Sequence, residues 1–241
     1  MNNLKMDIPL PLQQDTVTSP PWSLTDTWIG LALLPMILVL SIFLAVIIKP
    51  LKGHEDIILV FSELIFIFPV LIVLSVRRVN YTFLGYHKFD ARPVGLGCGL
   101  VAAAYCISVV NNIIFSKLGQ SVQADKIIQL LKSLSSPLSL IVAGVILAPI
   151  VEETFFRGFL FAGFRQRYGY QKAALLSSAI FAAAHLQLSA FIPTFLLGYI
   201  FSYLYQRSNS ILPGMLMHFL VNTFGISTIL ILVHFGYFTP R

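Results

Sequence analysis

The stretch LIVAGVILAPIVEETFFRGFLFAGF, residues 140–164, decides the fold class of this chain. About 20 consecutive apolar residues are enough to cross a bilayer as a helix, and this stretch is longer. It nevertheless carries Glu152, Glu153 and Arg157 within two helical turns. A charged side chain at mid-bilayer costs roughly 3 kcal/mol, so three of them must pair or face a wet cavity. We therefore expect a membrane helix that forms part of a functional site.

The spacing of the three charged residues separates their roles. Glu153 and Arg157 are four residues apart, so they share a helix face and can form an ion pair. Glu152 points about 100° away from that pair, because successive residues of a helix are rotated by that angle. We expect Glu152 to be the carboxylate that remains available for chemistry.

The composition of the whole chain agrees with a bilayer as its main solvent. Of 241 residues, 57% are hydrophobic and 11% are charged, whereas soluble domains carry about 25% charged residues. The net charge of +6 is typical of basic loops that anchor a membrane protein, and no Lys/Arg run indicates nucleic-acid binding. The sequence therefore predicts an all-α membrane protein, since apolar runs of this length must satisfy their backbone internally.

Seven apolar segments are predicted to span the bilayer, and an eighth stays open because Gly225 could break the last one. A single helical membrane domain is expected over residues 27–241, after a flexible polar tail at residues 1–26. Residues 116–136 resemble an amphipathic surface segment. The predicted spans are residues 27–48, 57–76, 93–115, 137–164, 172–188, 191–205 and 211–234.

Basic loop residues favour a cytoplasmic N-terminus in the plasma membrane. With seven spans, nine basic residues fall on the N-terminal side and six on the other, and cytoplasmic loops carry the excess. The first set is Lys5, Arg77, Arg78, Lys88, Arg92, Arg165, Arg167, Lys172 and Arg207; the second is Lys49, Lys52, Lys117, Lys126, Lys132 and Arg241.

Two further spans contribute polar side chains to the same expected site. The fifth span carries His185, with Phe181 one turn earlier on the same face, and the last carries His218 and Asn222, four residues apart. A carboxylate and an imidazole can together deprotonate a water, while His and Asn can donate hydrogen bonds to an oxyanion. This inventory matches hydrolysis of a carbonyl compound, most simply an amide.

A metal-dependent mechanism is the competing interpretation. Glu152, His185 and His218 would make a two-His, one-carboxylate set of the kind that catalytic Zn²⁺ uses. The sequence has no HExxH motif, however, and the three ligands would come from separate helices. We favour metal-free hydrolysis and assign no cofactor, with Zn²⁺ kept as the alternative.

At these residues the chain resembles the CPBP intramembrane proteases, also called the Abi or CAAX-protease family. The family's EExxxR motif is present as Glu152, Glu153 and Arg157, its FxxxH motif as Phe181 and His185, and its HxxxN motif as His218 and Asn222. The resemblance covers about residues 137–225, the expected catalytic core.

The resemblance implies a glutamate-dependent intramembrane endopeptidase, similar to the type II CAAX prenyl endopeptidases. Glu152 and His185 would activate water, and His218 and Asn222 would form the oxyanion site. Both metalloprotease and metal-free mechanisms are described for the family. The implied partners are the lipid bilayer and a membrane-associated peptide or protein substrate, such as a lipidated C-terminus or a leader peptide.

Two other functions remain open at this stage. A non-enzymatic membrane protein, such as a bacteriocin self-immunity factor or a scaffold, would keep the polar cluster to bind a partner. A transporter with a buried proton relay is the third interpretation. A transporter should lose substrate flux when Glu152 is changed, whereas a binding protein can tolerate the change.

Overall fold

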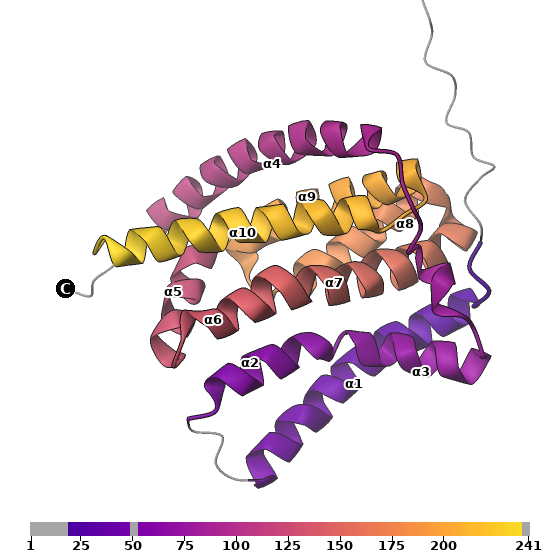
Figure 1. The fold of residues 1–241 in the computed structure, drawn as a ribbon, viewed down its shortest axis with the longest axis horizontal. Coiled ribbons are helices and arrows are strands. Elements are labelled where there is room, and N and C mark those ends of the chain that lie inside the picture. The colour runs from indigo at the N-terminus through magenta and orange to yellow at the C-terminus, as the bar shows by residue number, and fades with distance from the viewer. Residues whose placement is uncertain (1–18, 49–52, 238–241) are drawn as a thin grey trace, which may run out of the picture.

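The structure, a computed structural model, describes residues 19–48 and 53–237, with side chains left out at residues 44–48. Every regular element of this described part is a helix (Figure 1). Six of the described helices are long and apolar enough to cross a membrane. The prediction of an all-α membrane protein is therefore confirmed.

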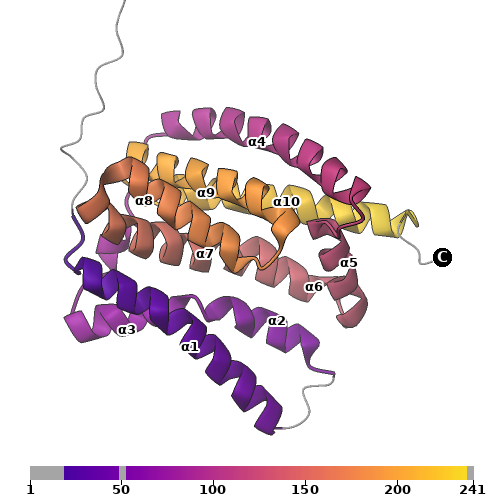
Figure 2. The same ribbon diagram turned by 180° about the vertical axis from the view of Figure 1, so that it is seen from behind.

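The helices form layers on either side of a central stretch that contains the EExxxR motif (Figures 1 and 2). Helices α1 to α3 lie on one side of it, and α8, α9, α10 and α4 lie on the other. The outer helices are α1 (Leu24–Ile48), α2 (Glu55–Leu64), α3 (Ile67–Arg77), η2 (Tyr81–Leu84), α4 (Arg92–Lys117), α5 (Gln123–Ser133), α9 (Leu188–Ser208) and α10 (Leu212–His234). The central stretch comprises α6 (Pro137–Leu140), η3 (Ile141–Leu147), α7 (Ala148–Glu153) and η4 (Thr154–Phe161), and the chain continues from it into α8 (Ala162–Ala184).

The first helix begins three residues before the first predicted span, and it is tied to the core. Helix α1 begins at Leu24, and Trp22 before it is buried with its ring 5.3 Å from that of Phe159. Asp26 accepts hydrogen bonds from Ser23 and forms an ion pair with Arg77 at 2.7 Å, which ties α1 to the end of α3. These residues belong to the bundle, whereas positions 1–18 of the predicted tail lie outside the described residues.

The number of spans depends on how the central stretch is divided. Pro137–Ala184 forms one helical stretch of 48 residues, more than twice the ~20 residues that cross a bilayer. Gly169 interrupts it with φ 72° and ψ 173°, between the predicted fourth and fifth spans. Gly225, in contrast, lies inside an unbroken α10, so it does not supply the eighth span. The count of seven stays a prediction.

The predicted amphipathic segment contains α5, which lies against the ends of its neighbours. Ile128 is its buried residue, and further apolar side chains of α5 pack with Leu140 of α6 and Ile226 of α10. Asp125 caps the start of the helix by accepting from the backbone N–H of Val122. Helix α5 therefore uses its apolar face to cover one end of the bundle.

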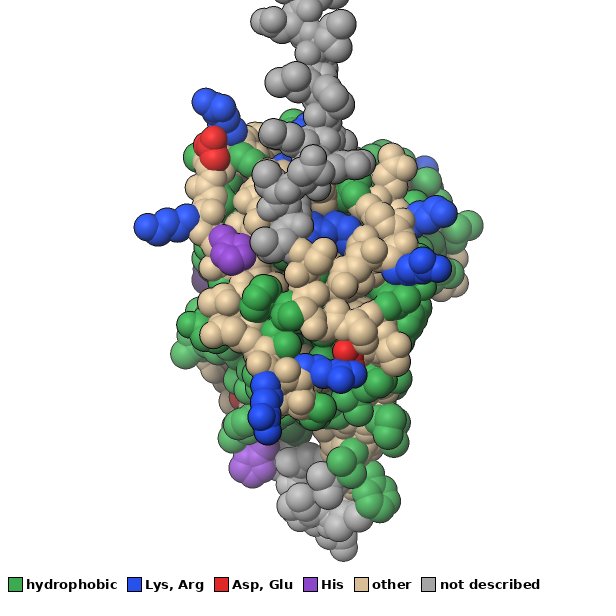
Figure 3. Space-filling model, turned by 90° about the vertical axis from the view of Figure 1, so that its right-hand side faces the viewer, with side chains coloured by type: hydrophobic (Ala, Val, Ile, Leu, Met, Phe, Trp, Pro, Cys, Tyr) green, Lys and Arg blue, Asp and Glu red, His purple; other side chains and the backbone are tan. Residues whose placement is uncertain are grey.

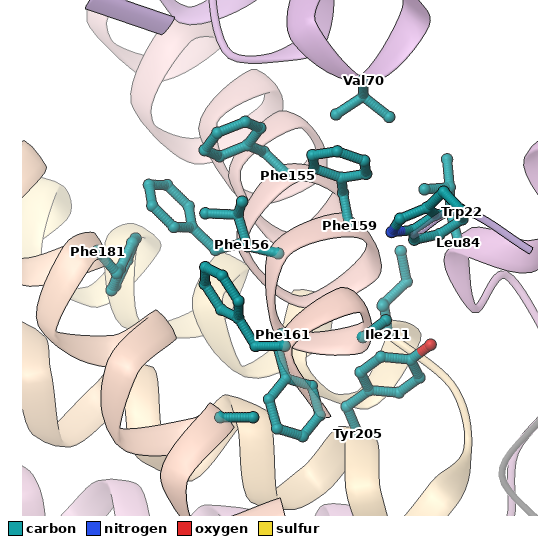
Figure 4. Packing of buried hydrophobic residues seen from close by; sticks show 14 of the residues in the cluster. Trp22, Val70, Leu84, Phe155, Phe156, Phe159, Phe161, Phe181, Tyr205 and Ile211 are labelled. Carbon is teal, nitrogen blue, oxygen red and sulfur yellow. The ribbon is translucent and has the colours of Figure 1, made fainter. Parts of the chain in front are cut away.

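The main core is built from the phenylalanines that follow the two glutamates (Figure 4). Phe155, Phe156, Phe159 and Phe161 are fully buried and project from η4 in different directions. In Figure 4, Phe155 and Phe159 point towards Val70 and Trp22 of the α1–α3 side, while Phe156 lies near Phe181 of α8. The motif helix therefore lies at the centre of the packing.

Basic residues gather at the end of the bundle where α3 ends and α4 begins (Figure 3). This end holds the α3–α4 connection, the break at Gly169 and the α9–α10 turn. We expect residues 77–92 and 165–172 to face the cytoplasm, because clustered Lys and Arg are retained on that side. In a background without Cys98 and Cys106, single cysteines in these segments should be labelled only after the membrane is permeabilised. Labelling from outside intact cells would contradict this orientation.

Candidate active site

The helix that carries Glu152 and Glu153 is distorted on both sides of the pair. Two π-helical segments, η3 and η4, flank the short α7. A π segment bonds each N–H to the carbonyl five residues earlier, and such segments frequently occur at functional sites. Because each one changes the helical rotation, the direction of Glu152 differs from that in an undistorted helix.

Pro149 makes one backbone carbonyl of this helix available to another helix. The N–H of Ala148 donates to the carbonyl of Ala143, five residues earlier. The next bond in that ladder would reach Gly144, but Pro149 has no N–H to donate. The Gly144 carbonyl instead accepts a hydrogen bond from the Nδ2 amide of Asn222 at 2.7 Å. Asn222 is therefore held against the motif helix, and it makes no hydrogen bond to His218 among the described residues.

The predicted ion pair forms, and it extends to a third residue. Arg157 Nη1 lies 2.8 Å from Glu153 Oε1, and both side chains are completely buried. The same carboxylate oxygen lies 3.1 Å from Nδ1 of His218, which is also buried. Glu153 therefore links its own helix to α10. The sequence does not predict this contact between the two helices.

Aromatic rings surround the guanidinium of Arg157. Its Cζ atom lies 4.3 Å from the centroid of Phe181, 5.2 Å from that of Phe201 and 5.8 Å from that of Phe156. A cation over an aromatic face is stabilised by about 2 kcal/mol or more when it is desolvated. This enclosure compensates part of the burial cost, although Nε and Nη2 of Arg157 have no hydrogen-bond partner within the described part of the chain.

His218 lies between the two glutamates. Its Nδ1 faces Glu153, and its Nε2 lies 3.8 Å from Oε2 of Glu152. The ring also stacks on Phe201, with centroids 5.3 Å apart. A distance of 3.8 Å is too long for a hydrogen bond. Oε2 of Glu152 is buried and has no hydrogen-bond partner among the described residues, so a carboxylate oxygen and an imidazole nitrogen face each other without a hydrogen bond between them.

His185 approaches the same cluster from the end of α8. Its Nδ1 lies 2.9 Å from the carbonyl oxygen of Phe181, and its ring packs on the Phe181 ring at 5.0 Å. The same Phe181 ring contacts His218 at 6.0 Å. Leu186, with φ 50°, ends the helix directly after His185. Both imidazoles thus contact the Phe181 ring, although His185 makes no described ion pair or hydrogen bond to Glu152.

The alternative set of metal ligands is not assembled in this structure. Glu152, His185 and His218 do not form a group that could hold a metal ion, and no other set of three such side chains does so among the described residues.

Some residues that build the site are not among those predicted from the sequence. Glu63 lies on α2, a helix that contacts the helix α7 of Glu152, and it is the only acidic residue of the predicted 57–76 span, which the sequence shows. A Cβ at Gly198 would lie 3.0 Å from Arg157 Nη2, and one at Gly214 would lie 3.3 Å from Glu153 Oε2. These two glycines allow α9 and α10 to approach the ion pair, and nothing in their local pattern indicates this.

The part of the chain that matches a known protein family contains the residues of this site. Residues 134–224 match the family described as type II CAAX prenyl endopeptidase Rce1-like, which confirms the predicted resemblance. The "Putative membrane peptidase YdiL" of Bacillus subtilis is 32% identical over 90 residues, 37% of this chain and 36% of that protein. An "Uncharacterized 24.3 kDa protein" of Escherichia coli is 41% identical over 86 residues, 34% of this chain and 40% of that protein. The chain therefore covers well under half the length of these relatives, and no solved structure matches it.

Removing Arg157 should damage folding as well as any activity. Breaking a buried pair by deleting one partner typically costs about 3–5 kcal/mol, because the other charge is left alone. Arg157→Ala should therefore lower the folded yield and the melting temperature in detergent. Glu152→Ala should leave both much closer to wild type, because Glu152 has no ion-pair partner on its own helix. Arg207→Ala, at an exposed position, is the control. If Arg157→Ala were as stable as the wild type yet inactive, Arg157 would belong to the catalytic machinery instead.

The close approach at Gly198 gives a second stability prediction. A methyl group there would meet Arg157 and would lie 3.2 Å from Cα of Ser178 in the neighbouring helix. Gly198→Ala should therefore destabilise the protein by about 1–3 kcal/mol, as overpacking does. Gly99→Ala in α4 is the matched control, because a Cβ there meets nothing within 4 Å. Equal melting temperatures for the two variants would show that α9 can move away from the pair.

Proposed function

We propose that this protein is an intramembrane endopeptidase of the CAAX type, which hydrolyses a peptide bond of a membrane-associated substrate. The observation that supports it best is the unpaired, buried Oε2 of Glu152, which faces Nε2 of His218 at 3.8 Å. The match of residues 134–224 to the Rce1-like family covers these residues. A carboxylate without a partner beside an imidazole is suited to proton transfer rather than to holding the fold together.

In the proposed reaction, Glu152 acts as the base. It takes a proton from a water molecule, with His185 as its helper, and the water oxygen attacks the carbonyl carbon of the substrate. The carbonyl electrons move onto the oxygen and form a tetrahedral oxyanion. When this intermediate collapses, the C–N bond breaks and Glu152 returns the proton to the leaving amine.

His218 and Asn222 are the proposed donors to the oxyanion. Asn222 Nδ2 carries two hydrogens, and only one of them is used by the Gly144 carbonyl. Because the Glu153 carboxylate accepts from Nδ1 of His218, Nε2 can donate only when the ring carries both protons. The buried Glu153 carboxylate would stabilise that positive ring. Donors fixed in this way stabilise developing charge without having to reorganise.

Replacing Glu152 tests the function directly. Wild-type protein, Glu152→Gln and the control Glu55→Gln would be reconstituted in vesicles with two quenched fluorescent peptides. One probe ends in a farnesylated CAAX tail, and the other is the same peptide without the lipid. Glu152→Gln should keep the wild-type melting temperature and lose roughly 10²–10⁴-fold in rate, which is the range of general acid–base catalysis.

The control and the second assay decide between the alternatives. Glu55 is the first residue of α2 and accepts from the backbone of Gly53, so Glu55→Gln should cleave at the wild-type rate. Peptides from cell membranes, compared by mass between wild-type and Glu152→Gln samples, extend the search beyond the two probes. Absence of any Glu152-dependent product in all these assays would exclude the peptidase and favour a self-immunity or scaffold protein.

A further inference from the structure

One short segment between two predicted spans joins the helices that carry Glu152 and His218. It is the 84–87 segment, which leads from η2 towards α4. In Figure 1 this connection runs along the end of the bundle, past the motif helix and the start of α10. Its residues make hydrogen bonds to both helices, and none of these bonds takes part in the proposed reaction.

On the motif helix, the segment is bonded to the turn that contains Glu152. The hydroxyl of Tyr86 forms a hydrogen bond with Oγ1 of Thr154. The Thr154 hydroxyl already donates its one hydrogen to the carbonyl of Ile150 at 2.6 Å, so Tyr86 is the donor. The backbone N–H of Thr154 closes α7 on the same carbonyl. Tyr86 is therefore attached to the helical turn of the proposed base.

The backbone of the segment also lies directly against this helix. A Cβ at Gly158 would lie 2.7 Å from the carbonyl oxygen of Leu84, so a glycine is needed for the approach. Gly158 follows Thr154 by four residues, about one helical turn. One side-chain contact and one backbone contact thus fix the segment along the motif helix.

On the other side, the segment is bonded to the start of α10. The N–H of Ile211 donates to the carbonyl of Gly85 at 2.9 Å, and the hydroxyl of Ser210 donates to the carbonyl of His87 at 2.6 Å. Ile211 precedes His218 by seven residues, about two helical turns. The segment therefore holds the beginning of the helix that presents His218.

Two points of attachment are needed to fix the gap between Glu152 and His218. The contact of Glu153 with His218 at 3.1 Å is one point, but two helices can turn about a single contact. The 84–87 segment is the second point, bonded through Tyr86 to the motif helix and through both neighbours of Tyr86 to α10. The two points together hold Nε2 of His218 3.8 Å from Oε2 of Glu152.

The bond from Tyr86 is not needed to satisfy a buried polar atom. Thr154 is buried, but its hydroxyl already has a partner in the Ile150 carbonyl, and 37% of Tyr86 is exposed. Changing Tyr86 to phenylalanine therefore leaves the Thr154 hydroxyl with its other partner. Positioning can thus be separated from folding by experiment.

We propose that Tyr86 is a positioning residue of the active site, whose hydroxyl fixes the turn of Glu152 relative to His218. It does so by joining the motif helix to a segment that is itself bonded to α10. Tyr86 acts through Thr154 and touches no reacting atom. This inference rests on the proposed function, because it concerns the same two groups.

The kinetics of Tyr86→Phe test this role. With the two fluorescent probes in vesicles, kcat should fall by about tenfold, because a misplacement of ~1 Å can cost on the order of 10²-fold in rate. KM should stay unchanged, because the substrate is bound by other groups. Tyr81→Phe is the matched control, since Tyr81 is 66% exposed on η2 and makes no described hydrogen bond. A lower melting temperature with the wild-type kcat, as a purely structural role predicts, would overturn the inference.

A second pair of variants shows whether the effect passes through Thr154. Thr154→Val has nearly the same shape but no hydroxyl for Tyr86 to bond. Adding Tyr86→Phe to Thr154→Val should cause no further loss of kcat, since both changes remove the same bond. Thr154→Ser keeps the hydroxyl, so Tyr86→Phe should still lower kcat in that background. Additive losses in the Thr154→Val background would contradict the proposed role.

A spectroscopic test needs no substrate. The protein would be labelled with ¹⁵N at its five histidines, and His218→Gln would identify the ring signals of His218. These signals should shift in Tyr86→Phe and stay in place in Tyr81→Phe. The signals of His234, the last residue of α10, should stay in place in both variants. Unshifted His218 signals in Tyr86→Phe would overturn the inference.

The two failures can be told apart. If the wild type shows Glu152-dependent cleavage while Tyr86→Phe has the wild-type kcat, only the role of Tyr86 is wrong. If no Glu152-dependent cleavage occurs, the proposed function fails, and the His218 signals still decide whether Tyr86 positions this ring.

Discussion

The buried ion pair between Glu153 and Arg157 is the interaction on which the rest of the site depends. A carboxylate and a guanidinium that are both removed from solvent cost several kcal/mol each to desolvate, so each must find compensation nearby. Glu153 finds it in Arg157 and His218, and Arg157 finds it in Glu153 and the surrounding aromatic rings. Helices α8, α9 and α10 therefore have to close around this pair, and in doing so they bring Phe181, Phe201 and His218 to Glu152.

The backbone of the motif helix supplies the second constraint. Its two π segments and Pro149 change the direction of the helix turns around the glutamates and leave the Gly144 carbonyl to be satisfied from outside. An unpaired carbonyl inside a membrane costs several kcal/mol, so Asn222 is held in place by a structural requirement as well as by its proposed role. The distortion and the position of Asn222 are thus two consequences of the same sequence, GVILAP at residues 144–149.

The features that the sequence predicts are those that depend on local spacing. Four-residue spacing predicted the ion pair of Glu153 with Arg157, and apolar runs predicted the spans, because both follow from one helix in apolar surroundings. Contacts between helices were not predictable in this way. The bond from Glu153 to His218, the bond from Asn222 to Gly144 and the place of Glu63 depend on how helices far apart in sequence approach one another. The small residues that allow this approach, Gly198 and Gly214, carry no chemistry that a motif would reveal.

The two glutamates of the motif differ in their hydrogen-bond partners, and this difference distinguishes a structural role from a chemical one. Oε1 of Glu153 has two partners, and only its Oε2 is buried without one, whereas Glu152 makes no described hydrogen bond and its buried Oε2 faces His218 at 3.8 Å. Buried polar atoms without partners are rare in folded proteins, and each requires a specific reason. A scaffold or binding protein would gain stability if an apolar residue replaced Glu152, whereas a hydrolase needs an acceptor whose lone pairs are not already occupied. The carboxylate without a described hydrogen bond is therefore the one to which the proposed reaction assigns the proton transfer.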